Sequence, residues 1–378
     1  MADWFALYQP QIKCSDDKIY MKHLNLVSIG IIGLLLVSSC SDVVHRVGTV
    51  DFKQSYDLKH KGNGTELMLR SGTLFVMDTL LGVFSYSSES LCTFYSIPNG
   101  MKEIDGYGTF GNGPGEFLQP KFCYVYGSTI GLSEVNKQEL VRLDISYENG
   151  KLSVSERKRL KAPYKMKKGE LVLPDYDFYR LDDKHYVAPH QGLDNDFYTL
   201  LDDSLQPVVR FGEPPIPEKL PPLAAANRLN GEIAAHEGTM FFALYDLPYL
   251  ACYRLESGQM QKQWSFYYNE AHYAVRNNDL LYDRDKTFGQ VNDLDTDGQY
   301  VYLLYLDQLL SEYDGTKTEK SLANKILVFD YEGNGVAVLN LDCRLSNMAL
   351  SKDSRTLYGI ANLPEPTIVE FDMPKGWR

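Results

Sequence analysis

The chain has 378 residues, a net charge of −12 and 12% aromatic residues. A chain of this length can bury a large core, either as one domain or as two to three smaller ones. The acidic balance argues against a nucleic-acid partner, because binding phosphate groups requires a basic surface. Short runs of Val, Ile, Leu, Phe and Tyr between Gly, Asn and Asp turns predict an all-β protein.

The first 39 residues have the composition of a leader. Residues 1–20 share no pattern with the rest, and we interpret them as an upstream mis-start, with the true start at Met21. A basic region at 21–23, an apolar stretch over 24–36 and small residues after it are typical of a secretory signal peptide at 21–39. The apolar stretch is shorter than the roughly 20 residues of a membrane span.

Residues 37–40 read Val-Ser-Ser-Cys, an aliphatic residue, two small residues and a cysteine. This pattern resembles the lipobox of bacterial lipoproteins, which implies that Cys40 is lipidated and becomes the first residue of the mature chain. A plain signal anchor is the alternative. A lipid on Cys40 would attach the domain to a membrane surface through a short tether at 40–45. Lipoproteins of Bacteroidetes that reach the cell surface usually carry several acidic residues after the cysteine, and here only Asp42 stands. The resemblance therefore implies a periplasm-facing outer-membrane protein over one at the cell surface.

Residues 46–378 read as one domain of repeated four-stranded units. The clearest runs are interpreted as the second strands, at 73–78, 129–134, 185–188, 239–244, 300–305 and 356–361. Third strands ending in a carboxylate are expected at 140–144, 198–202, 251–256, 326–330 and 368–372, and 82–86 takes this place in the first unit. Four-stranded repeats of about 40–50 residues are typical of a β-propeller, so six units predict six blades.

The last unit lacks a fourth strand, because few residues follow Asp372. We expect 47–52, the N-terminal strand of the mature chain, to supply it and close the ring, which removes two exposed sheet edges. Four connections, 158–176, 212–230, 267–290 and 309–324, are longer than blade turns. Such loops either carry function or have drifted as unconstrained surface. Within the third of them, 270–276 is expected to form a short helix.

The stretch 106–120 holds five glycines and a proline within its first ten residues, which suits a tight crossing between two blades. Gly111–Phe117 with Pro120, followed by Val-Arg-Leu-Asp at 141–144, resembles a blade of the NHL-type propellers. Together with the lipobox, the chain resembles the TolB-like six-bladed propeller lipoproteins of Bacteroidetes. That resemblance implies a propeller of the cell envelope and no particular activity.

No motif for catalysis is complete. The run 293–298 begins like a calcium loop, but its twelfth position is Leu304 where a glutamate is needed, so we prefer a hairpin turn. The histidines have no zinc-binding spacing. His190, His236 and His272 fall near predicted blade ends, where each is expected to be satisfied by a turn; convergence on the propeller axis is the alternative. No catalytic, cofactor or metal residue is therefore assigned.

Four cysteines besides Cys40 fall in strands of separate units and are predicted to be buried free thiols: Cys92, Cys123, Cys252 and Cys343. The sequence as a whole favours a lipid-anchored binding or scaffold module of the envelope, with a protein, peptide or glycan ligand and no cofactor. The alternative is a lyase or hydrolase with a metal or polar site on the propeller axis. Histidines or carboxylates converging on the axis would favour the enzyme, and apolar or scattered residues would favour binding.

Overall fold

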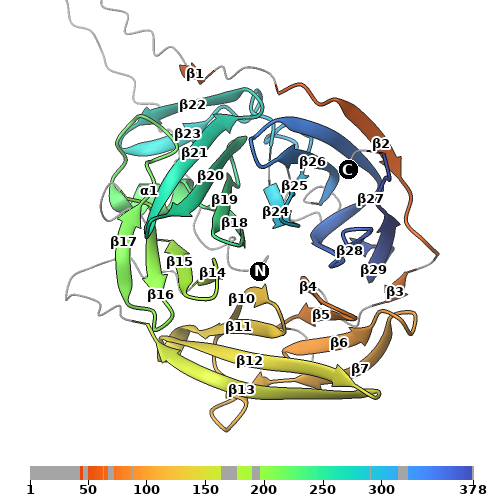
Figure 1. The fold of residues 1–378 in the computed structure, drawn as a ribbon. Coiled ribbons are helices and arrows are strands. Elements are labelled where there is room, and N and C mark those ends of the chain that lie inside the picture. The colour runs from red at the N-terminus through yellow and green to blue at the C-terminus, as the bar shows by residue number, and fades with distance from the viewer. Residues whose placement is uncertain are drawn as a thin grey trace, which may run out of the picture.

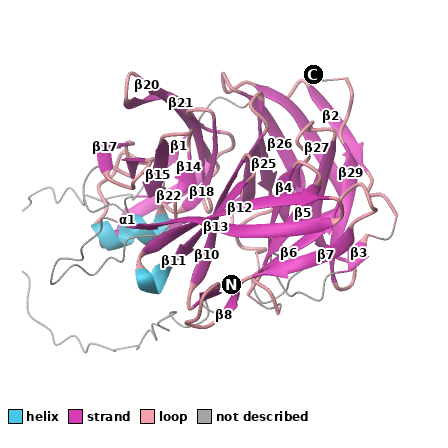
Figure 2. Ribbon diagram, turned by 60° about the horizontal axis from the view of Figure 1, so that its bottom comes forward, coloured by secondary structure: helices cyan, strands magenta, loops and turns pink. Residues whose placement is uncertain are grey.

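The computed structural model describes residues 43–45, 50–62, 64–66, 72–86, 89–162, 177–189, 196–289, 291–313 and 322–376. These residues form an almost entirely β structure whose sheets surround a common centre, a propeller-like arrangement (Figure 1). Helix α1 (Pro222–Arg228) and the short 3-10 helix η2 (Val135–Lys137) are the described exceptions, and Figure 2 shows α1 beside the strands. Residues 1–39, Cys40 and His190 lie outside the described residues.

Four sheets are separate, and each has four antiparallel strands in sequence order. The first is β4 (Thr73–Met77), β5 (Leu80–Phe84), β6 (Cys92–Ser96) and β7 (Lys102–Tyr107). The second is β10 (Pro120–Tyr126), β11 (Thr129–Glu134), β12 (Glu139–Glu148) and β13 (Lys151–Lys161). The third is β14 (Tyr179–Arg180), β15 (His185–Pro189), β16 (Tyr198–Asp202) and β17 (Pro207–Phe211). The fourth is β18 (Gly231–His236), β19 (Thr239–Leu244), β20 (Tyr249–Glu256) and β21 (Gln259–Tyr267).

Six four-stranded blades were expected, and four separate four-stranded sheets are found; the remaining strands of the propeller-like arrangement form one continuous sheet of eight. Its strands are β24 (Val291–Thr296), β25 (Tyr300–Tyr305), β26 (Ala323–Asp330), β27 (Gly335–Leu350), β28 (Thr356–Asn362), β29 (Pro366–Asp372), β3 (Thr65–Glu66) and β2 (Gln54–Leu58). The cause is β27, whose first part pairs with β26 and whose last part pairs with β28. After Gly335 its sequence contains no glycine or proline that would end the strand.

The N-terminal segment pairs differently from the prediction that 47–52 closes the ring. Residues 50–52 lie outside any strand, and 47–49 lie outside the described residues. Instead, β2 runs parallel to β27, and β3 pairs with β29. The side chain of Phe52 packs edge-on against Phe329, at 5.4 Å between ring centroids. This apolar stretch therefore covers the core, and the residues after it supply the edge pairing.

In the first unit, the runs predicted as second and third strands are the first and second strands of the sheet. The run 73–78 is the inner strand β4 and 82–86 falls largely in the second strand β5, whereas in the other units the predicted second strands are second strands. No glycine marks the short hairpin at Asp78 in the sequence, and Asp78 itself adopts a left-handed φ of 51°. Asparagine and aspartate tolerate this conformation better than other side chains do.

The two ends of the ring differ in their connections. Hairpins between first and second strands and between third and fourth strands lie at one end, which we call the turn face, and most are tight. Connections into each inner strand and between second and third strands lie at the other end, because strand direction alternates within a blade. We call that end the loop face; its longer described segments are 108–119, 212–230, 268–289 and 306–313.

The connection after β21 contributes two strands, β22 (Ala271–Arg276) and β23 (Asp279–Tyr282), to a small three-stranded sheet. Its third strand is β1 (Val43–His45), which pairs with β22. The helix predicted over 270–276 is therefore wrong. Burial alternates along β22, with Ala271 and Tyr273 buried, and Asn277 and Asn278 both have left-handed φ values of 53° and 64°. Two such residues form the tight turn that favours a β-hairpin. No described helix has the length and apolarity needed to cross a membrane.

Candidate functional site at the propeller axis

Polar side chains gather where the inner strands begin, at the loop face. The strands β4, β10, β14, β18 and β24 lie nearest the centre in Figure 1. Lys121, Asp177, Glu232 and Asp293 lie at or near the start of β10, β14, β18 and β24, Asn347 lies in β27, and Tyr245 lies in the loop after β19. We call this group the axial cluster: Lys121, Asp177, Glu232, Tyr245, Asp293 and Asn347. Because each blade starts its inner strand at the same face, residues distant in sequence meet there.

Lys121 and Asp177 join two neighbouring blades. The Lys121 Nζ atom lies 2.5 Å from Asp177 Oδ2, and their side chains are 32% and 13% exposed. Lys121 is the second residue of β10, and Asp177 comes just before β14. The phenol of Tyr86 is close to both: burial raises its pKa, and Lys121 acts in the opposite direction. A half-buried ion pair of this kind is screened less by salt than an exposed one.

Glu232 accepts a hydrogen bond of 2.6 Å from the phenol of Tyr245. The antiparallel pairing of β18 with β19 places Gly231 opposite Leu244. Glu232 and Tyr245, the residues that follow these two, are therefore diagonal neighbours across the two strands. Burial raises the pKa of the Glu232 carboxyl, and the bond from Tyr245 and the charge of Lys121 oppose that shift. Burial, followed by the charge of Glu232, holds the pKa of Tyr245 well above its usual range.

Asp293 faces a second carboxyl group. Its Oδ2 atom accepts hydrogen bonds from Asn347 Nδ2 at 2.5 Å and from the backbone N–H of Met348 at 2.8 Å. Burial, and then the charge of Glu232, raise the pKa of Asp293 well above its usual range. Two interacting carboxylates cannot both ionise readily. We therefore expect the Glu232–Asp293 pair to retain a proton at a higher pH than an isolated carboxyl group does.

Asp295 repeats the contact of Asp293 one step further along β24. Its Oδ2 atom accepts a hydrogen bond of 3.1 Å from the N–H of Leu350. Burial raises the pKa of Asp295 to about 6. Residues two apart lie on the same face of a strand, so Asp293 and Asp295 together bind the backbone of β27 at Met348 and Leu350.

The run 293–298 is therefore mostly a strand. The hairpin turn expected for it begins only at Asp297, whose Oδ1 atom accepts hydrogen bonds from the N–H groups of Gln299 and Tyr300. Asp293 and Asp295 belong to β24. The run does not form a single loop around an ion, because its first two carboxylates contact the neighbouring strand.

The described histidines do not converge on the axial cluster. His236 ends β18 at the turn face, and an added Cβ on Gly298 would lie 2.8 Å from its ring. His272 lies in β22, where its Nε2 atom is 3.2 Å from a Glu270 carboxylate oxygen. Within the described ranges, the one group of three metal-ligating residue types with ligand atoms inside 4.8 Å of each other is His60, Asp342 and Cys343. The axial carboxyl groups do not form such a group.

The glycine-rich stretch lies between β7 and β10, as an inter-blade crossing, which confirms that prediction. Within it, β8 (Thr109–Phe110) pairs in parallel with β9 (Glu116–Phe117). The N–H of Gly113 donates a bond of 2.6 Å to Glu116 Oε2, and a Cβ on Gly111 would lie 2.1 Å from that oxygen. The Glu116 side chain could move away from a larger residue, but Gly111 also has a φ of 154°, a backbone conformation that residues with a side chain rarely adopt.

Two arginines connect the second and third blades. Arg142 and Arg180 each donate from Nη1 to Asp203 Oδ1 at 2.9 Å. The Arg180 guanidinium also lies 4.4 Å from the ring centroid of Tyr186. Hydrogen bonding and the charges of both arginines keep the pKa of Asp203 below its usual range, although burial acts in the opposite direction. Cys92, Cys252 and Cys343 are free and buried, as predicted, and Cys123 is buried as well.

Solved structures of low sequence identity resemble this chain in fold. No protein-family model matches the chain, and no curated protein matches it. A member of the DUF4221 family from Bacteroides vulgatus is 9% identical, with 87% of this chain and 97% of that chain covered and a TM-score of 0.49. A candidate exported protein from Bacteroides fragilis is 9% identical, with 85% and 99% covered and a TM-score of 0.49. The Cps50 (Swd1) β-propeller domain from Myceliophteria thermophila is 11% identical, with 83% and 100% covered and a TM-score of 0.43.

Proposed function

We propose that this protein is an exported β-propeller that binds a protein, peptide or glycan ligand at the axial cluster. The observation that carries the proposal is the meeting of polar side chains from four inner strands at the loop face, where Lys121, Glu232, Asp293 and Asn347 are fixed by rigid elements. Sites held by strands and surrounded by long loops are the usual place of ligand recognition on such scaffolds.

The charge of the axial cluster points to the chemistry of the ligand. Asp177, Glu232 and Asp293 oppose one cation, Lys121, which is already paired with Asp177. A ligand that offers hydrogen-bond donors, such as the amines of a basic peptide or the hydroxyls of a glycan, would complement these acceptors. An anionic ligand would meet repulsion from the same groups.

A hydrolase or lyase is the second candidate function. Glu232 and Asp293 come from two different sheets, and the pKa of each carboxyl is raised by burial, so that one of them could serve as a general acid. Binding is favoured because Asp293 and Asp295 are committed to backbone N–H groups of β27. A metal-assisted reaction finds no support at the axis, where the described carboxyl groups form no three-ligand set.

The proposal includes six blades over residues 46–378, with the two halves of the eight-stranded sheet counted as blades five and six. It is supported by the contacts of successive inner strands, which run from β4 through β10, β14, β18 and β24 to β27 and back to β4. It is also supported by the pairing of β3 with β29, which supplies the fourth strand of the last blade.

We further propose that Cys40 is lipidated and anchors the domain at the outer membrane, facing the periplasm, with no nucleic-acid partner. The support is the Val-Ser-Ser-Cys pattern at the end of a signal-like segment. Mass spectrometry of the mature amino terminus from cells should find a lipid-modified Cys40. A chain that begins elsewhere, or an unmodified cysteine, would exclude the anchor.

The ligand-binding proposal is tested by screening peptide and glycan arrays and titrating the hits calorimetrically. We expect a basic peptide or a neutral glycan among the hits, with affinity reduced about tenfold or more in Glu232→Gln, since a lost charged hydrogen bond costs about 1.5–3 kcal/mol. The matched control is Asp78→Asn, a 75% exposed carboxylate on the turn face, which should bind as the wild type does. Equal losses in both variants, or in neither, would contradict binding at the axis.

A further inference from the structure

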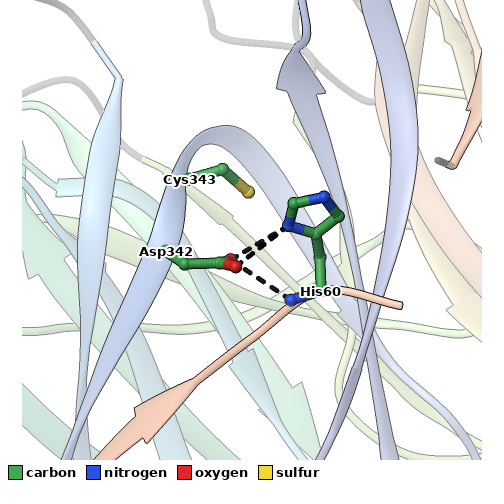
Figure 3. A group of neighbouring side chains, drawn as sticks. All are labelled: His60, Asp342 and Cys343. Carbon is green, nitrogen blue, oxygen red and sulfur yellow. Dashed lines mark hydrogen bonds and ion pairs between the residues drawn. The ribbon is translucent and has the colours of Figure 1, made fainter. Parts of the chain in front are cut away.

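A group of three chemically different ligand atoms lies on the outer rim, where the N-terminal segment crosses β27 (Figure 3). The Nδ1 atom of His60 is 3.1 Å and 3.2 Å from the two carboxylate oxygens of Asp342. The Sγ atom of Cys343 completes the group, in which all ligand atoms lie within 4.8 Å of one another. In Figure 3 the side chains of Asp342 and Cys343 both point toward the imidazole.

The chain builds this group from two segments 282 residues apart. His60 follows β2 and is held by a backbone bridge to Phe371 and by its own N–H, which donates to Asp342 Oδ1 at 3.2 Å. Asp342 and Cys343 are consecutive, so a straight strand would direct them to opposite faces. They lie in a part of β27 without register partners, after Leu341, which pairs with Leu58 of β2, and before Leu345, where the strand passes from one half of the sheet to the other.

We propose that His60, Asp342 and Cys343 bind a zinc ion, with water as the fourth ligand. Imidazole nitrogen, carboxylate oxygen and thiolate sulfur are the three ligand types that zinc takes in proteins, at about 2.0–2.3 Å from the metal. Tetrahedral geometry at those distances separates the ligand atoms by about 3.3–3.8 Å, which small side-chain rotations reach from the present positions. Calcium and magnesium are disfavoured, because they prefer oxygen ligands alone.

Burial and charge are compatible with an ion entering from solvent. The side chains of His60 and Asp342 are 26% and 32% exposed, and Cys343 is buried at 9%. Burial, followed by the charge of Asp342, raises the pKa of the Cys343 thiol to about 12, so this thiol is protonated at neutral pH when no metal is bound. Zinc binding forms a bond to sulfur and releases the thiol proton to solvent, while the His60–Asp342 hydrogen bond gives way to two metal bonds.

A zinc ion at this position would fasten the N-terminal segment to the ring. Five residues of β2 and two of β3 already pair that segment with the eight-stranded sheet, and a metal at His60 would add a further connection. A metal that joins residue 60 to residues 342 and 343 adds its binding free energy to the folded state, because the three ligands are far apart in the unfolded chain. The site lies on β27 at the rim, and the inference does not depend on ligand binding at the axial cluster.

The test is zinc binding to the untagged full chain, measured by calorimetry and by elemental analysis after gel filtration. We expect one zinc ion per chain in the wild type, a rise in Tm on adding zinc, and loss of both in His60→Ala. The matched control is His185→Ala, because His185 has the same Nδ1 contact to a carboxylate, 3.0 Å to Asp182, and forms no described three-ligand group. The control should keep one zinc ion per chain.

Substitution with cobalt tests the sulfur ligand without relying on a fold-sensitive variant alone. Wild-type chain loaded with Co²⁺ should show a thiolate-to-cobalt charge-transfer band in the near ultraviolet, and Cys343→Ser should lack it. Circular dichroism shows whether the Cys343→Ser chain has folded. If it has not, the presence or absence of the charge-transfer band in the wild-type chain alone tests the sulfur ligand. Absence of stoichiometric zinc, retention of zinc in His60→Ala, or a cobalt spectrum without the thiolate band would each overturn the proposal.

Discussion

The phenol of Tyr245 donates a 2.6 Å hydrogen bond to Glu232, and the charge of Glu232 in turn raises the pKa of Asp293 in the neighbouring blade. A single carboxyl group thus connects a loop-face phenol to the inner strand β24. A substitution at Glu232 should therefore change the pKa of Asp293 as well as the hydrogen bond from Tyr245. For this reason Glu232 is the residue at which we test ligand binding at the axis.

Glu232→Gln should lower the pKa of Asp293. The amide keeps an oxygen that Tyr245 can reach but removes the negative charge that favours a protonated Asp293. Carboxyl carbon NMR of selectively labelled chain measures this titration directly. An unchanged Asp293 titration would show that the two groups are not electrostatically coupled.

Asp295→Asn should flatten part of the pH dependence of stability. Burial raises the pKa of Asp295 to about 6, so the folded chain holds this proton more tightly than the unfolded chain, in which the pKa is near 4. The resulting stabilisation is complete below about pH 4 and is lost as the pH rises through about 6, an effect of about 1–3 kcal/mol.

Urea unfolding between pH 4 and 8 measures this difference for wild type and Asp295→Asn side by side. Carboxyl groups with lowered pKa values, such as Asp203, change in the opposite direction and are common to both chains, so they cancel. If the two curves stay parallel across this range, the pKa of Asp295 is not raised in the folded protein.

Asp203→Asn should lower the free energy of unfolding by about 1–2 kcal/mol. Arg142 and Arg180 are 10% and 4% exposed and would lose the charge of their shared partner, but Asp203 is itself 44% exposed, so solvent screens part of the effect. The matched variant is Asp279→Asn, whose partner Arg228 is 40% exposed; an exposed pair contributes at most about 1 kcal/mol. Chemical denaturation should therefore rank Asp203→Asn as clearly the more destabilising, and the reverse order would contradict the inter-blade role of Asp203.

Leu58→Ala should destabilise the protein by about 2–4 kcal/mol. Leu58 of β2 is 8% exposed and packs into the apolar cluster of the eight-stranded sheet, so its truncation removes buried contacts. Lys59→Ala, at the neighbouring exposed position, serves as the control and should change stability little. Equal and small effects would mean that the N-terminal segment does not dock on β27.

The repeat could be predicted from the sequence because its strands are apolar runs between turn residues. Strands such as 129–134 and 239–244 match β11 and β19 residue for residue. The short hairpin at Asp78 was missed because it lacks glycine, and the continuity of β27 was missed although no breaker follows Gly335. The Asn277-Asn278 dipeptide was the available signal for the hairpin there, because asparagine adopts a positive φ more readily than most residues.

The axial cluster was beyond sequence reasoning. Glu232 stands among Gly, Ile and Ala in β18, and Asp293, whose pKa its charge raises in addition to burial, belongs to another sheet. Their meeting depends on where each inner strand enters the ring, which no local pattern encodes. Asp293 and Asp295 are two residues apart, a spacing that is compatible with one face of a strand. The same residues also match the start of a calcium loop, so the spacing alone does not distinguish the two structures.

The most direct test of ligand binding at the axis is a crystal structure of the chain with the tightest-binding peptide or glycan from the arrays. Our account predicts ligand density at the loop face, with an amine or hydroxyl of the ligand within about 3.2 Å of a Glu232 carboxylate oxygen. Ligand density on the turn face or on the outer rim, with Glu232 and Asp293 unchanged and uncontacted, would contradict it.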